Sequence, residues 1–263
     1  MWHWGKEMAL QTEKEIIQLQ RRLKDLADKS FRQNIYTFSG FLGLAELEVY
    51  YRMEKELFFS HPALFGGDEG AERKMVRFGS PEEFGYEEEY PITCLHVKPL
   101  LAKFADKLSH RDFLGALMNL GMERSCIGDI RVGEKEGFLY CQSSMAEYIC
   151  ENLTQIKHTH VKCEVVEQIG TTGADEPEEQ SVLVSSLRLD GCIAKLYNIS
   201  RNESLSLFQS GRVYVDGRLT ENNSRALKGG EVVNVRGYGK FVYKGVKYES
   251  KKGKLCLEMS VYR

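Results

Sequence analysis

One short segment divides this chain and limits how it can fold. Residues 170–180 read Gly-Thr-Thr-Gly-Ala-Asp-Glu-Pro-Glu-Glu-Gln. Glycine, proline and acidic side chains without large apolar residues are typical of a mobile linker. A chain of 263 residues with 42% apolar content can bury more than one core. We therefore expect two or three domains, with a boundary at this linker.

Charge is distributed unevenly on the two sides of the linker. Residues 181–263 contain 15 Lys+Arg and 7 Asp+Glu, a net charge of +8, and residues 1–180 contain 21 and 31, a net charge of −10. The total of −2 therefore hides a basic carboxy-terminal third. A solubilising surface is the simple alternative, but a basic patch confined to one domain is typical of a nucleic-acid-binding module.

The basic third contains a helix with a recognisable start. Ser200 and Glu203 have the spacing of a capping box, in which each side chain accepts from the other residue's main-chain amide. The helix is expected over residues 201–210, ending at a glycine. Leu205 and Phe208 are three residues apart on one face, so we expect both to point into the core.

A shorter helix and two strands complete the predicted module. The helix is expected over residues 190–197, and the strands over 212–215 and 232–235. The dipeptide Asp216-Gly217 follows the first strand and is a strong hairpin-turn signal.

Two features of this module are suited to RNA. Arg201 lies in the first helical turn, where free amides and the positive dipole end favour an anion, and a guanidinium can hold phosphate with two parallel bonds. Residues 236–240 read Arg-Gly-Tyr-Gly-Lys, and glycines beside an aromatic let the backbone approach RNA closely. From its position alone, however, Arg201 could equally be a solvated surface residue.

Residues 89–170 are predicted to form a second domain in the order strand, helix, strand, strand, helix, strand. This is the ferredoxin-like split unit that RNA-recognition motifs share. Only Phe138 and Tyr140 match the aromatic pattern of a base-stacking sheet, so the domain is expected to position partners more than to read bases. The predicted strands are 92–97, 130–132, 137–141 and 161–166, and the predicted helices are 109–120 and 144–156.

Residues 1–88 are predicted to form a helical amino-terminal domain with a glycine-rich basic loop. Ile16, Leu19, Leu23 and Leu26 recur at helical spacing. The loop, residues 66–74, places three glycines beside Arg73 and Lys74, which could contact phosphate. An ordinary connecting loop is the alternative. Because the loop does not end in Gly-Lys-Ser/Thr, we exclude a Walker-type nucleotide hydrolase.

Other classes of protein are disfavoured by what the sequence lacks. Its seven cysteines are scattered without a Cys-x-x-Cys pair, which suits a reducing cytoplasm better than a disulfide framework or structural zinc. His158 and His160 would share one face of a strand while Cys163 faces the other way, so no metal or cofactor is expected. No apolar run approaches the roughly 18 residues of a membrane span. We therefore expect a cytoplasmic protein without membrane partners.

Three segments in one order resemble the YlmH-type family of S4-domain RNA-binding proteins. Residues 66–74 resemble its Gly-Gly-x-Glu-Gly-Ala-Glu-Arg signature, and residues 120–130 resemble its Leu-Gly-(x)-x-Arg…Ile-Gly-Asp-Ile element. Residues 188–240 resemble its carboxy-terminal domain, so the resemblance covers nearly the whole chain. It implies an α+β protein with a helical amino-terminal domain, a ferredoxin/RRM-like central domain and, over residues 181–263, an S4-like (αL) RNA-binding domain.

The resemblance also implies a function on the ribosome. The expected partners of this chain, as a monomer, are rRNA of the large ribosomal subunit, tRNA and the ribosome, in quality control of stalled ribosomes carrying an obstructed peptidyl-tRNA. Arg201 matches the second-helix arginine that S4-type domains use on RNA. The residues expected to bind RNA are Arg188, Lys195, Ser200, Arg201, Arg212, Arg236, Tyr238, Lys240, Arg73 and Lys74.

Two other classes of function compete with a non-enzymatic RNA-binding factor. Pseudouridine synthases often carry an S4-type domain and use an Arg-Leu-Asp motif, which is present here at residues 188–190. In this chain the motif opens a helix of the S4-like domain, and no separate catalytic domain carries a second copy, so no catalytic residue is predicted. The third class is a cell-division scaffold that acts through the acidic amino-terminal two-thirds.

Overall fold

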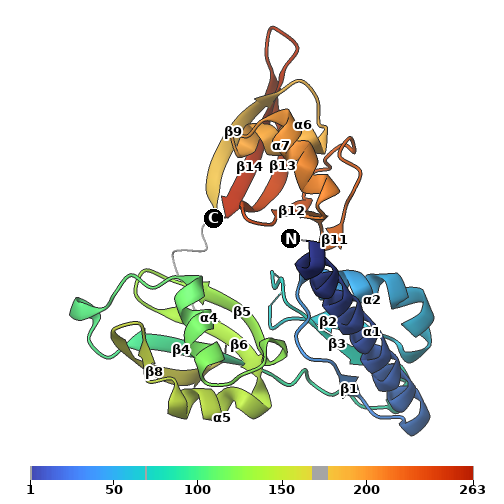
Figure 1. Cartoon of the computed structure of the whole chain (residues 1–263), viewed down its shortest axis with the longest axis vertical. Helices are drawn as coiled ribbons and strands as arrows, with labels where there is room; N and C mark the ends of the chain where they lie inside the picture. The colour runs from blue at the N-terminus through green and yellow to red at the C-terminus, as the bar shows by residue number, and fades with distance from the viewer. Residues whose placement is uncertain (1, 69, 168–176, 263) are drawn as a thin grey trace. The chain divides into compact units, whose positions relative to one another are not determined.

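The computed structural model describes residues 2–68, 70–167 and 177–262 (Figure 1). Its contacts divide the chain into two compact units, Met1–Asp175 and Glu176–Arg263. Helices and antiparallel sheets occur in both units, which confirms the predicted α+β class. The two predicted amino-terminal domains lie together in the first unit. Within the described ranges, no helix is long and apolar enough to cross a membrane.

The first layer of the amino-terminal unit is built around two helices, α1 (Trp2–Gln33) and α2 (Leu44–Leu57). Leu23 and Ala27 are fully buried and share a core with α2. Of the other periodic residues, Leu19 and Leu26 pack partly buried against this core, whereas Ile16 is 39% exposed. The layer also contains a sheet with the order β1-β3-β2, so the prediction of a helical domain is incomplete. Strands this short have no detectable alternation in the sequence. Their bounds are Thr37–Phe38 for β1, Ala63–Phe65 for β2 and Met75–Phe78 for β3.

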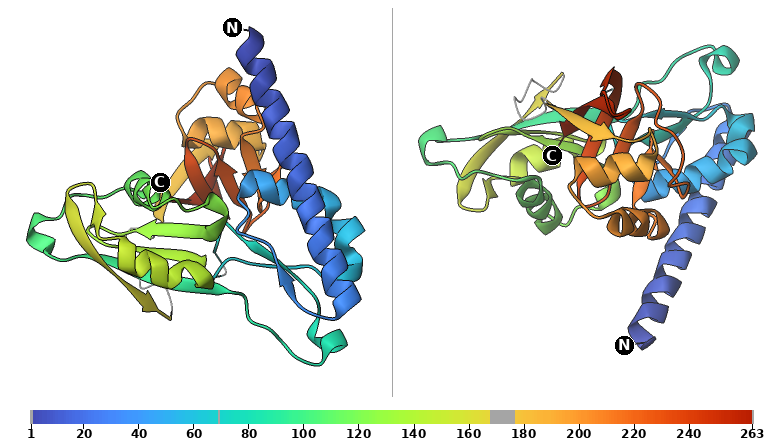
Figure 2. Two further views of the ribbon diagram at one scale, coloured as in Figure 1. Left: turned by 60° about the horizontal axis from the view of Figure 1, so that its bottom comes forward. Right: turned by 90° about the horizontal axis from the view of Figure 1, so that it is seen from above.

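The second layer is a five-stranded antiparallel sheet with the order β5-β6-β4-β8-β7. Two helices, α4 (His110–Asn119) and α5 (Ser143–Asn152), share one core against one face of it (Figures 1 and 2). The strands are β4 (Ile92–Pro99), β5 (Ile127–Val132), β6 (Gly137–Gln142), β7 (Gln155–Ile156) and β8 (Thr159–Val166).

The second helix of this layer is shorter than predicted. It ends at Asn152, and residues 155–156, expected to be helical, pair with β8 instead. Lys157 has a φ of 52° and forms the tight turn between β7 and β8. A non-glycine residue with positive φ carries little sequence signal, which explains the misplaced boundary.

Part of the sheet face that lies opposite α4 and α5 is covered by the first layer. Phe138 and Tyr140 of β6 are 6% and 4% exposed and pack with Phe41 and Met75. A Cβ atom on Gly67 would lie 2.6 Å from the Tyr140 ring, so the chain passes directly over this aromatic. The two aromatics that matched a base-stacking sheet are therefore core residues.

The carboxy-terminal unit is a six-stranded antiparallel sheet with the order β11-β10-β12-β13-β14-β9. Helices α6 (Leu189–Leu196) and α7 (Arg201–Gln209) pack on it through a shared core (Figures 1 and 2). The strands are β9 (Glu178–Val184), β10 (Val213–Val215), β11 (Arg218–Leu219), β12 (Val232–Val235), β13 (Gly239–Glu249) and β14 (Leu255–Tyr262).

The predicted turn is confirmed, and the extent of the predicted linker is corrected. Asp216 and Gly217 have φ values of 50° and 77°, the paired positive values of a type I′ hairpin turn. Residues 178–180, assigned to the linker, form the start of β9 and pair with β14. Their side chains are acidic and polar because β9 is an edge strand. Residues 170–176 of the predicted linker lie outside the described residues.

The buried face of α7 also differs from the prediction. Leu207 and Phe208 are 2% and 3% exposed, whereas Leu205 is only half-buried. Ser204 takes the inner position instead, and its hydroxyl donates to the carbonyl of Asp190 at 2.8 Å. This bond joins α7 to the start of α6 and sets which face of α7 is inside. A polar residue at a core position cannot be recognised from apolar spacing.

Candidate nucleic-acid interface

The amino-terminal end of α7 is held by one half of the predicted capping box. Ser200 Oγ accepts from the amide of Glu203 at 3.1 Å. The carboxylate of Glu203 accepts from the Tyr238 hydroxyl at 2.8 Å, and among the described residues it makes no bond back to Ser200. The interaction also raises the pKa of Tyr238. Tyr238 therefore fixes the turn between β12 and β13 to α7.

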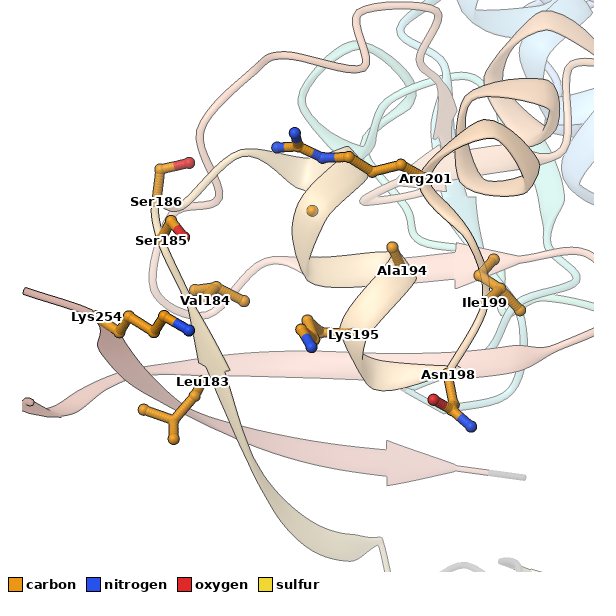
Figure 3. A pocket seen from close by; sticks show the side chains of 11 residues that line it. Leu183, Val184, Ser185, Ser186, Ala194, Lys195, Asn198, Ile199, Arg201 and Lys254 are labelled. Carbon is orange, nitrogen blue, oxygen red and sulfur yellow. The ribbon is translucent and has the colours of Figure 1, made fainter. Parts of the chain in front are cut away.

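Arg201 lies at this end of α7 with its side chain exposed. Its guanidinium forms no hydrogen bond or ion pair with any residue the structure describes. It lines a cavity together with Lys195 of α6 and Lys254, which immediately precedes β14 (Figure 3). Lys195 and Lys254 are exposed too, and their ammonium groups have no described ion-pair partner. Two of the predicted RNA-binding residues, Lys195 and Arg201, are thus brought to one site.

The cavity has a volume of about 320 Å³ and a mixed lining. Leu183, Val184, Ala194 and Ile199 contribute apolar surface, and Ser185, Ser186 and Asn198 contribute polar groups (Figure 3). The lining contains no acidic residue. Three cations in one concave site without a neutralising carboxylate repel one another, and an anion that enters it relieves this repulsion.

Arg188, also predicted to bind RNA, is paired inside the unit. Its Nε and Nη2 donate to the two oxygens of Asp190 at 3.1 and 2.8 Å. Asn223 and the amide of Gly191 also donate to this carboxylate. Asp190 is 3% exposed, and the hydrogen bonds from Arg188 lower its pKa. Arg188 therefore serves mainly to neutralise a buried acid, although part of its side chain reaches solvent.

The remaining predicted contacts of this unit lie around the turn at residues 236–239. Arg212 donates to the carbonyl of Arg236, and the Arg236 guanidinium lies 5.2 Å from the centre of the Tyr214 ring. A Cβ atom on Gly237, whose φ is 88°, would lie 2.4 Å from Arg212 Nη2. Glycine at this position therefore allows Arg212 to pack against the turn. This contact explains the glycine without requiring that RNA approach the backbone here. Lys240 lies 5.0 Å from the ring of Tyr262.

Arg73 is a structural residue, which corrects its assignment as a phosphate contact. Its Nε donates to the carbonyl of Ile127 at 2.8 Å, and its Nη2 donates to those of Phe41 and Arg124, both at 3.0 Å. Burial lowers its pKa. Its guanidinium is therefore occupied by three main-chain carbonyls. Lys74 pairs through its main chain with Leu42 at the edge of the first layer.

The two signature segments of the amino-terminal unit contact each other. The carboxylate of Asp129 accepts from the amides of Glu72 and Arg73 at 2.7 and 3.0 Å. Asp68 and Arg131 form an ion pair at 2.5 Å. Residues 66–74 and 120–130 therefore join the two layers of the unit. Glu69 lies outside the described residues.

Several residues of the cavity carry no signal of their own in the sequence. Lys254 belongs to a lysine-rich segment with no recognisable motif, and Ser185 and Ser186 lie in no motif either. The lysine content of the basic third was the only available signal. In the described ranges, no group of three or more His, Cys, Asp or Glu could hold a metal ion.

Comparisons with known proteins found a family model, a related sequence and a solved structure. Residues 86–169 match the family model described as "Putative RNA-binding domain in YlmH". The chain is 30% identical over 200 residues to ribosome-associated protein quality control protein P2 of Bacillus subtilis (strain 168), covering 73% of this chain and 74% of that protein. A solved structure, the cell division protein YlmH from Streptococcus pneumoniae, matches with 18% identity and a TM-score of 0.45, covering 58% of this chain and 91% of that one.

Proposed function

The chain belongs to the YlmH family, and on this premise we propose that it is a non-enzymatic RNA-binding factor of the ribosome. The observation that carries the proposal is the cluster of Lys195, Arg201 and Lys254, which lies exposed in a unit whose predicted extent has a net charge of +8. Cations without neighbouring acids attract the phosphate backbone, which supplies most of the sequence-independent affinity of RNA-binding proteins.

We interpret the carboxy-terminal unit as the S4-like domain, because two short helices precede its hairpin in the order that the sequence indicates. The middle of the amino-terminal unit is interpreted as RRM-like, in keeping with the match over residues 86–169. Phe138 and Tyr140 are buried in this domain, so a base cannot stack on either ring while the first layer stays in place. RNA contacts of this domain would then use its other surfaces.

The relative from Bacillus subtilis has a name that places that protein in ribosome-associated quality control, and this supports the ribosome as a partner. For this chain we propose the large subunit as the binding site, with rRNA and the bound peptidyl-tRNA as partners of a single copy. The cationic cluster would hold their backbones and fix position without reading sequence.

The test is co-sedimentation of the full chain with large ribosomal subunits over a series of salt concentrations. Arg201→Ala removes one uncompensated charge, so we expect affinity to fall about tenfold and the slope of log affinity against log salt to decrease by about one. Lys252→Ala is the matched control, because Lys252 is exposed and does not line the cavity. Equal binding and equal slopes for the wild type and Arg201→Ala would refute this surface.

The absence of catalysis is part of the proposal. The aspartate of the Arg-Leu-Asp motif, Asp190, is buried, and its oxygens accept from Arg188, Asn223 and Gly191. A nucleophilic carboxylate has to reach its substrate, and this one is occupied within its own unit. We expect no tritium release from RNA labelled at uridine C5, and release that depends on Asp190 would establish a synthase.

A further inference from the structure

The cavity at α7 is built partly from elements outside the helix-helix-strand motif. One wall is the end of β9, with Leu183, Val184 and the two serines that follow. The opposite wall is α6 and the connection from α6 to α7. In Figure 3, Lys254 extends into the cavity from the strand side, and Lys195 projects from α6 on the other side. Arg201 extends along the rim toward Ser186 (Figure 3).

The shape and lining of the cavity exceed what a backbone phosphate of an RNA helix requires. Backbone phosphates are contacted by basic and polar side chains and by main-chain amides, and such contacts need no apolar surface. Here about 320 Å³ of concave space has apolar side chains as well as cations, and this volume lies in the range of small-molecule sites. A ligand that fills it should combine an anionic group with a flat or apolar body.

A nucleotide has this combination. Its phosphate would contact Lys195 and Lys254, and its base and ribose would cover Leu183, Ala194 and Ile199. An arginine guanidinium can stack on an unpaired base, and hydroxyl and amide groups can bond its edge. Arg201 supplies the guanidinium at the rim, and Asn198 supplies an amide. A base paired in a helix cannot enter, because it is stacked between its neighbours.

We propose that this cavity binds one unpaired nucleotide, with its phosphate, that protrudes from the RNA held by the carboxy-terminal unit. The inference rests on the proposed RNA-binding function and adds the feature that is recognised, a bulged or extruded nucleotide. The same chemistry is present in a free nucleoside monophosphate. The binding experiment therefore compares a nucleotide within RNA with the free nucleoside monophosphate.

The experiment compares the affinity of the full chain for two RNA hairpins that differ only by one bulged nucleotide, with each of the four bases in turn. For the wild type we expect at least one bulged hairpin to bind about tenfold tighter than the paired hairpin. An abasic bulge should lose most of this gain. Free nucleoside monophosphate at millimolar concentration should not displace the bulged hairpin.

Gly191→Leu tests the cavity without changing charge. Gly191 lines the cavity, and a Cβ atom built on it meets no atom within 4 Å, so the leucine can extend into open space. We expect this variant to bind the bulged hairpin no more tightly than the paired hairpin, so that the preference for the bulge is lost whatever its affinity for the paired form. Gly191→Ala, which adds only the Cβ atom, is the matched control and should keep the preference. Equal thermal unfolding of the two variants excludes misfolding.

Lys254→Gln is an independent test of the phosphate position, with Lys252→Gln as its control. We expect Lys254→Gln to reduce binding of the bulged hairpin several-fold more than binding of the paired hairpin. Equal affinity of the wild type for both hairpins, or an unchanged preference in Gly191→Leu, would overturn the inference and leave the proposed function standing. Displacement by the free monophosphate would assign the cavity to a free nucleotide instead. Failure of the wild type to bind any RNA would overturn both.

Discussion

At the scale of single residues, Asp190 is a buried carboxylate with a depressed pKa. The bonds from Arg188 favour its charged form in the folded chain. Its contribution to stability is therefore fully present above the unfolded-state pKa of about 3.9 and is lost as pH falls toward the lower folded-state pKa. Because it joins α6 to Asn223, it stabilises the helical side of the carboxy-terminal unit.

We expect Asp190→Asn to lower the free energy of unfolding at pH 7 by about 2 kcal/mol, because the guanidinium of Arg188 loses its charged partner. Urea denaturation between pH 2 and pH 7 would measure this. The difference between wild type and variant should shrink below pH 4, where the wild-type carboxylate becomes protonated. A difference independent of pH would contradict the assigned role of the charge.

At the scale of secondary structure, α7 shows how a core face is chosen. Leu207 and Phe208 face the sheet, and Ser204 occupies the third inner position because its hydroxyl reaches the carbonyl of Asp190. Leu205 is half-buried beside them. The rotation of the helix also directs Arg201 outward, so the core contacts of α7 place the cationic cluster at the surface.

The pair Leu207→Ala and Leu205→Ala tests this assignment. Removing a fully packed leucine leaves a cavity, so Leu207→Ala should cost about 2–4 kcal/mol of folding free energy. Leu205→Ala should cost about 1 kcal/mol or less, because a half-exposed side chain loses little buried area. Chemical denaturation of both variants would measure the two losses of folding free energy. Equal losses would restore the face predicted from the sequence.

At the scale of the whole molecule, the amino-terminal unit depends on contacts between its two layers. Arg73 donates to carbonyls of Phe41, Arg124 and Ile127, which belong to different parts of the unit. Asp129 holds the main chain of residues 72–73 from the other side. The two signature segments thus join the two layers, which keep Phe138 and Tyr140 covered.

Arg73→Lys keeps the positive charge and removes the planar fork of donors, so it separates structure from phosphate binding. We expect the amino-terminal unit to lose about 2–4 kcal/mol of stability, because three buried carbonyls lose a charged donor. RNA affinity of the folded chain should stay within about twofold, because the charge and the carboxy-terminal unit are unchanged. Hydrogen exchange of residues 120–142 would report the loosening, with Lys74→Gln as control.

Sequence alone determined the features of this protein that depend on residues a few positions apart along the chain. Helices α4, α6 and α7 and the Asp216-Gly217 turn follow from spacing, caps and glycine within a few residues. The uneven charge and the family signatures could also be read directly from the chain. These features persist because local backbone geometry leaves few alternatives.

Only the tertiary structure decided which charged residues are available to a ligand. Arg73 and Arg201 look equivalent in the sequence, each beside residues suited to phosphate. One is enclosed by carbonyls more than 30 residues away along the chain, and the other faces solvent beside Lys254. Solvation of a charge depends on which distant segments pack around it, and no local pattern encodes that packing.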